Sequence, residues 1–77
     1  MSQPTADDHW DAGEMGCGEL ILKLKVRVKR LPPAGVLHLR ALDAGARADL
    51  PAWCRLTGHP LVQEEHPNYW IQRKQEL

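Results

Sequence analysis

The stretch GCGELILKLKVRVKRL, from Gly16 to Leu31, decides the fold. It places Cys17 between two glycines and follows it with apolar and basic residues in near-strict alternation. Alternation is typical of a strand, but apolar residues spaced by three and four positions also form a helical stripe. The run is about twice as long as a typical strand of five or six residues, which favours a helix. Pro32 and Pro33 would end that helix.

If this run is a helix, Cys17 lies at its N-terminus, where unpaired backbone N–H groups and the helix dipole favour an anion. Only the thiolate form of a cysteine is a good nucleophile, so this position favours a reactive residue. The flanking glycines leave the sulfur sterically open, whereas the negative charge of Glu19 opposes thiolate formation. Cys17 is therefore the candidate nucleophile, and an inert Cys17 is the alternative.

Length and charge limit the classes of function. The 77 residues predict one domain, and a hydrophobic fraction of 43% is enough for one core. Ten basic and ten acidic side chains give zero formal net charge, so bulk charge supports neither nucleic-acid nor membrane binding. The charges are nevertheless segregated, because only acids precede Lys23 and only bases lie between Lys23 and Arg30. This asymmetry indicates a surface for a protein partner.

The chain contains two cysteines, Cys17 and Cys54, and no Cys-x-x-Cys pair. It shows no N-terminal apolar signal segment and no apolar run long enough to span a bilayer. We therefore expect a cytoplasmic protein with both thiols free, with a disulfide between them as the alternative. The four histidines lack metal-ligand spacing, so neither a metal nor a cofactor is expected.

A second helix is expected after the first, with residues 44–57 as its span. Asp43 would cap it, or Asp49 would cap a fresh start with Pro51 in the first turn. Gly58 would end it. Cys54 falls on the apolar face of this helix, so we expect a buried cysteine with a structural role. Strands are expected at 9–12, 36–42, 60–64 and 69–73.

This β-α-β-α-β-β order predicts an α/β two-layer sandwich. Two helices would cover one face of a four-stranded mixed sheet, and Tyr69 and Trp70 would pack on the helix-covered side. Residues 1–8 are expected to be disordered, 9–74 to form the domain and 75–77 to be a tail.

The first helix would have two unlike faces. At about 100° per residue, Leu22 and Val26 point outward, beside Lys25 and Lys29. This outer face is either a docking patch with an apolar centre and a basic rim, or an ordinary solvated face. The core face would consist of Leu20, Ile21, Leu24, Val28 and Leu31.

Several landmarks recur at the spacing of a known family. Trp10-Asp11-Ala12-Gly13 precedes Cys17, Pro33 precedes the second strand, and Asp43 follows it. The segment from Asp49 to Cys54 is similar to Asp-Ile-Pro-x-Phe-Cys, and His59-x-Leu61-Val62 follows. On these residues the chain resembles the TusA-like family of sulfur carriers, also called SirA-like. The resemblance covers Trp10 to about Lys74 and implies that Leu20 to Leu31 is helical.

The resemblance also implies a function. Cys17 matches the cysteine of the family's Cys-Pro-x-Pro motif, which carries a persulfide from a cysteine desulfurase or rhodanese to an acceptor protein, for example toward tRNA thiolation. Both motif prolines are replaced, by Gly18 and Leu20. A monomer with protein partners is therefore expected, and a non-catalytic interaction module is the alternative. The expected partner-binding residues are Gly18, Glu19, Leu22, Lys25, Val26 and Lys29.

Overall fold

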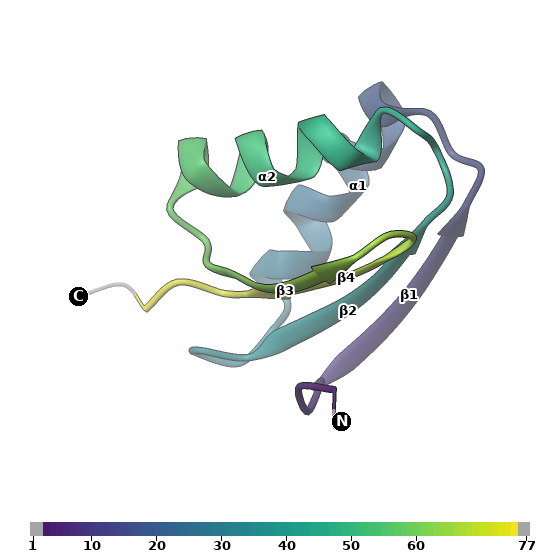
Figure 1. Ribbon diagram of the computed structural model, residues 1–77. Coiled ribbons are helices and arrows are strands. Elements are labelled where there is room, and N and C mark those ends of the chain that lie inside the picture. Colours follow the sequence, from purple (N-terminus) through teal and green to yellow (C-terminus); the bar gives the residue numbers. More distant parts are fainter. Residues whose placement is uncertain (1–2, 76–77) are drawn as a thin grey trace.

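The computed structural model describes residues 3–75 and contains four strands and two helices. Both helices lie on one side of the sheet, so the predicted α/β sandwich is confirmed (Figure 1). The strand order is β1-β2-β4-β3, with β1 parallel to β2 and the other neighbours antiparallel. In chain order the elements are β1 (Asp8–Gly13), α1 (Cys17–Lys29), β2 (Val36–Ala41), α2 (Ala46–Thr57), β3 (Leu61–Glu65) and β4 (Asn68–Gln72).

Helix α1 resolves the ambiguity of the deciding stretch. Leu20, Leu24 and Val28 recur at a spacing of four and are buried against the sheet, whereas Leu22 and Val26, which a strand would place on the same face, are exposed. Leu31 is buried just beyond the helix, and Ile21 packs at the edge of the core. The hydrophobic stripe therefore prevails over the alternation.

Helix α2 begins at Ala46 and continues through Pro51. The expected fresh start capped by Asp49 is wrong, because the Asp49 N–H already donates to the carbonyl oxygen of Gly45 at 2.9 Å. Asp43 instead stabilises the turn that precedes the helix, where its Oδ2 accepts a hydrogen bond from the Gly45 N–H. Gly58 ends the helix in the left-handed region with φ of 86°, as predicted.

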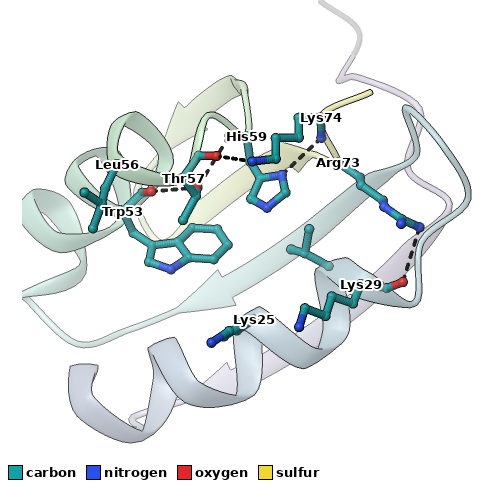
Figure 2. Close-up of a pocket in the computed structure, with 9 residues that line it drawn as sticks. Lys25, Lys29, Trp53, Leu56, Thr57, His59, Arg73 and Lys74 are labelled. Carbon is teal, nitrogen blue, oxygen red and sulfur yellow. Dashed lines mark hydrogen bonds between the residues drawn. The ribbon is translucent and has the colours of Figure 1, made fainter. Parts of the chain in front are cut away.

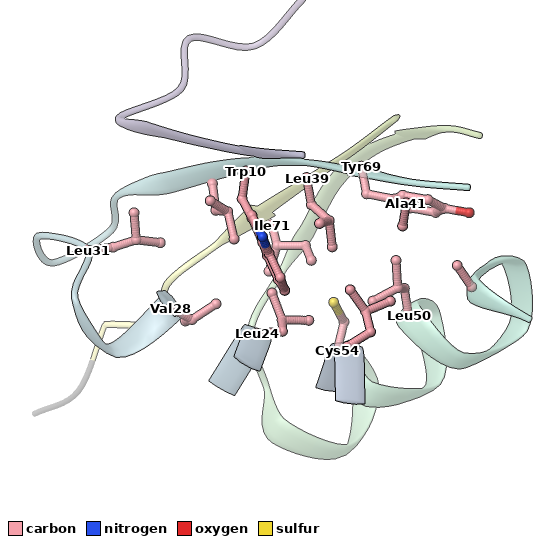
Figure 3. Packing of buried hydrophobic residues seen from close by; sticks show 13 residues of the cluster. Trp10, Leu24, Val28, Leu31, Leu39, Ala41, Leu50, Cys54, Tyr69 and Ile71 are labelled. Atoms are coloured by element: carbon pink, nitrogen blue, oxygen red, sulfur yellow. The ribbon is translucent and has the colours of Figure 1, made fainter. Parts of the chain in front are cut away.

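The core fills the space between the sheet and the two helices (Figure 3). Trp10, Leu39 and Ile71 contribute to it from β1, β2 and β4, and the Cys54 side chain lies within the same cluster. Tyr69 also faces the helices, but Trp70 does not, which corrects the expectation for that residue. Successive strand residues point to opposite faces, so Trp70 packs on the far side of the sheet, stacked on His38.

The N-terminal boundary differs by one residue from the expected one. Asp8, which we placed in the disordered segment, begins β1, and the Asp7 N–H donates to the Val36 carbonyl at 2.8 Å. Residues 1, 2, 76 and 77 lie outside the described residues, and so do those parts of the expected disordered segment and tail. Within residues 3–75, neither helix is long and apolar enough to cross a membrane.

Candidate functional site

Cys17 is the first residue of α1, and its side chain is half-buried. Gly16 precedes the helix without a side-chain cap, and its carbonyl oxygen accepts the Leu20 N–H at 2.9 Å. Gly16 and Gly18 are both exposed, and a Cβ atom at either position would meet nothing within 4 Å. The sulfur is therefore approachable from the side of the two glycines, as the sequence predicted.

The other side of the sulfur faces the start of α2. The Cys17 thiol donates a hydrogen bond to Asp43 Oδ2 at 3.1 Å, and the Gly45 N–H donates to the same oxygen at 3.1 Å. Gly45 is closely packed here. A Cβ atom at this position would lie 2.9 Å from Asp43 Oδ2, 3.1 Å from Cys17 Sγ and 3.5 Å from Asp49 Oδ2. Glycine thus allows two carboxylates and the thiol to meet.

These carboxylates determine the protonation of the thiol. The nearby Asp49 carboxylate, burial and the hydrogen bond to Asp43 together raise the pKa of Cys17 from 9.0 to about 12. The helix N-terminus was expected to favour the thiolate, but two nearby negative charges outweigh it. At neutral pH the isolated protein therefore holds Cys17 as a neutral thiol.

The acids that oppose thiolate formation at Cys17 are Asp43 and Asp49, and not Glu19, which the sequence indicated. Glu19 points away and pairs with Lys23 at 3.3 Å, with both side chains exposed. Asp43 is separated from Cys17 by 26 positions, so local spacing could not place it at the sulfur. The available signal was that Asp43 and Asp49 are both landmarks of the family resemblance.

The outer face of α1 is exposed as expected. Leu22 is 70% exposed and Val26 49% exposed, and within the described residues neither Lys25 nor Lys29 forms a salt bridge. The sequence missed Leu56 on α2, which is 86% exposed. Large apolar side chains with this exposure on neighbouring helices are candidates for partner contact.

Lys25 and Lys29 also border a cleft of about 700 Å³ between the two helices (Figure 2). Its wall includes Trp53, which stacks on His59 with ring centroids 5.3 Å apart. No carboxylate lines the cleft in the described part of the chain. The remaining lining residues are Val28, Leu56, Thr57, Arg73 and Lys74.

Two of the cleft's cations bind the ends of the helices. Arg73 Nη1 donates to the carbonyl oxygen of Lys29 at 3.3 Å, and Lys74 Nζ donates to that of Thr57 at 2.8 Å (Figure 2). Arg73 Nη1 also donates to the carbonyl oxygen of Leu31 at 2.5 Å. Cations are favourable near helix C-termini, so these two are structural. Lys25 and Lys29 are the other two lysines of the cleft, and no salt bridge holds them within the described residues.

Cys54 is buried, as predicted, with 4% of its surface exposed. Burial and the charge of Glu64 raise the pKa of its thiol to about 11. Both cysteines are free, so the alternative of a disulfide between them is not realised. Within residues 3–75, no group of three or more His, Cys, Asp or Glu side chains is arranged to hold a metal ion.

The fold and the site define a class: a small two-layer domain that presents one accessible cysteine at a helix start, beside an exposed apolar and basic surface. The family model described as "Sulfurtransferase TusA" matches residues 10–73, and the chain belongs to this family. It is 37% identical to the Sulfur carrier protein TusA of Pseudomonas syringae pv. syringae (strain B728a) and 33% identical to that of Pseudomonas putida (strain W619). Each match covers 96% of this chain and 98% of the relative.

Proposed function

We propose that this chain is a sulfur-relay protein that carries a persulfide on Cys17. The observation that carries the proposal is family membership over residues 10–73, combined with a cysteine at the start of α1 whose flanking glycines leave it open. Relatives that match nearly the whole chain are named sulfur carriers. The donor would be a cysteine desulfurase or a rhodanese, and the acceptor a second protein.

The transfer is an exchange at sulfur. The Cys17 thiolate attacks the outer sulfur of the donor's persulfide, the donor's S–S bond breaks, and the donor cysteine leaves as a thiolate. A new S–S bond then joins the outer sulfur to Cys17, with no net oxidation or reduction. The same exchange, with an acceptor cysteine as nucleophile, removes that sulfur. Exposed glycines on both sides of Cys17 support this role, because an attacking thiolate must reach the outer sulfur.

Loading requires that Cys17 lose its proton, which Asp43 and Asp49 oppose. A donor that places cationic groups beside these carboxylates would offset their charge and lower the pKa of the thiol. In this proposal Cys17 is a resting thiol in the free protein and becomes a nucleophile in the complex. Transfer is thereby confined to docked partners.

The docking surface would be the outer face of α1 around the cysteine. Leu22 and Val26 supply apolar contact, while Lys25 and Lys29 attract an acidic partner. Gly18 and Glu19 would lie at the edge of the contact, next to the sulfur. Action as a cytoplasmic monomer, without direct nucleic-acid contact, is also part of the proposal.

Cold cyanolysis tests the proposal, because it converts sulfane sulfur to thiocyanate. The protein is incubated with a cysteine desulfurase and free cysteine, separated from the enzyme and treated with cyanide. Thiocyanate is expected from the wild type and from Cys54→Ser, and none from Cys17→Ser. Equal yields from the wild type and Cys17→Ser would overturn the assignment of the carrier residue.

A further inference from the structure

Two histidines meet on the face of the sheet that the helices leave open. His9 in β1 and His38 in β2 are partners in the parallel register, and their Nδ1 atoms lie 3.1 Å apart. Trp10 and Leu39, the next pair in register, are buried in the core. Side chains alternate along strands, so the histidine pair lies on the opposite side of the sheet from the helices and Cys17.

The His38 ring is held by its surroundings. Its Nε2 lies 2.9 Å from Asn68 Oδ1, an oxygen that can only accept, so Nε2 carries the proton and Nδ1 has the free lone pair. The ring also stacks on the indole of Trp70, with centroids 4.8 Å apart and planes inclined by 19°. Trp70 is 1% exposed and therefore forms a fixed support. This lone pair is directed toward His9.

We propose that His9 and His38 form a two-histidine site for a borderline divalent transition metal, with Cu²⁺ as the strongest binder. Imidazole nitrogens suit Cu²⁺, Ni²⁺ and Zn²⁺, and the Irving–Williams order places Cu²⁺ first. Metal–nitrogen bonds of about 2.0–2.1 Å to both Nδ1 atoms would subtend roughly 100° at the ion, which is a normal angle between adjacent ligands. Water molecules would complete the coordination.

The remaining chemistry of the pair is compatible with a metal. Without one, His9 Nδ1–H donates to His38 Nδ1, so the two rings share this single proton. Metal binding would move that proton to His9 Nε2, so that the lone pairs of both Nδ1 atoms are available to the ion. The contact from His38 Nε2 to Asn68 is the kind of outer hydrogen bond that fixes the tautomer of metal-bound histidines. Since His9 is exposed, an ion reaches the site directly from solvent.

The proximity of Trp70 provides the test, because bound Cu²⁺ quenches a neighbouring indole. Cu²⁺ is titrated into a Cys17→Ser protein, in which the half-buried thiol cannot reduce the metal, and tryptophan fluorescence is followed. Saturable quenching at one ion per chain is expected. His9→Gln and His38→Gln should each weaken binding by at least about tenfold, as losses around metal sites typically do.

His59→Gln is the control, since His59 stacks on a different tryptophan, Trp53, and lines the cleft between the helices instead of the open face of the sheet. It should leave the Cu²⁺ titration unchanged. Electron paramagnetic resonance of the copper complex should show coupling to two nitrogens, reduced in His9→Gln. The proposal would be overturned by an absence of saturable quenching. Equal quenching in the Cys17→Ser protein and in the same protein carrying His9→Gln would also overturn it.

Discussion

Cys17 Sγ lies 3.1 Å from Asp43 Oδ2, so the residue that begins α1 is hydrogen-bonded to the residue that follows the second strand. With Asp49 nearby, this contact keeps the thiol protonated, and the pKa of Cys17 is about 12. The arrangement differs from the lowered pKa typical of cysteines that react with free reagents. It fits a cysteine that reacts only within a complex.

Removing either carboxylate should activate the thiol. Asp49→Asn and Asp43→Asn should each move the pKa of Cys17 from about 12 toward 9.0. The larger thiolate population outweighs the loss of intrinsic nucleophilicity, so full relief would speed alkylation at neutral pH by roughly 50-fold. Iodoacetamide rates across a pH series measure this. Glu19→Gln is the control, because Glu19 pairs with Lys23 at the surface. Unchanged rates in both Asp variants would refute the role of the carboxylates.

The two cysteines should label in a fixed order, with Cys17 first. The pKa of Cys54, about 11, lies below that of Cys17, about 12, which alone would favour Cys54. Cys54 is only 4% exposed, however, and a reagent must first reach the sulfur. Access therefore decides the order, and Cys54 should react only when the domain opens. Peptide mapping of native protein during iodoacetamide treatment checks this, and equal or faster labelling of Cys54 would reverse the assignment.

Gly45→Ala should disturb the contact between thiol and carboxylate. The new Cβ would lie 2.9 Å from Asp43 Oδ2 and 3.1 Å from Cys17 Sγ, so one of them must shift. Both atoms end side chains that can move, so we expect a loss of only about 1 kcal/mol in the free energy of unfolding, as for one weakened hydrogen bond. Faster alkylation of Cys17 should accompany it. Gly18→Ala is the matched control, because its Cβ meets nothing within 4 Å. Urea denaturation that shows equal stability for the two variants would contradict this packing.

Reversing the basic rim of α1 should weaken docking. Lys25→Glu combined with Lys29→Glu should reduce affinity for a cysteine desulfurase that loads the protein, and should flatten the salt dependence of binding. Far-UV circular dichroism should stay unchanged, since both side chains project from the helix surface. Arg55→Glu reverses a charge on α2 outside the cleft and should have little effect. Unchanged affinity in the double variant would exclude this surface.

The pattern of the deciding stretch allowed both a strand and a helix, and its length together with the family resemblance favoured the helix that the structure has. In that helix Leu20, Leu24 and Val28 form the buried face. Alternation along a strand requires adjacent Tyr69 and Trp70 to point to opposite faces, but local spacing does not show which of the two faces the helices. The expected capping role of Asp49 was wrong because backbone hydrogen bonds already form the helical turn that precedes it.

The chemistry around Cys17 was only partly predictable. Its place at a helix start and its open flanks follow from local sequence, whereas its pKa depends on Asp43 and Asp49, which the fold brings from the second half of the chain. The pair of His9 and His38 was likewise invisible, because their spacing of 29 positions gives no metal-ligand pattern. Parallel strand register, which sequence spacing does not reveal, brings the two rings together.

Intact mass spectrometry tests the central claim most directly. The protein is incubated with a cysteine desulfurase and free cysteine and is then weighed under non-reducing conditions. The sulfur-relay account predicts the addition of one sulfur atom to the wild type and to Cys54→Ser, its removal by a thiol reductant, and no addition to Cys17→Ser. If neither a desulfurase nor a rhodanese adds sulfur to Cys17, the account is contradicted, and the chain retains the family's fold without its sulfur chemistry.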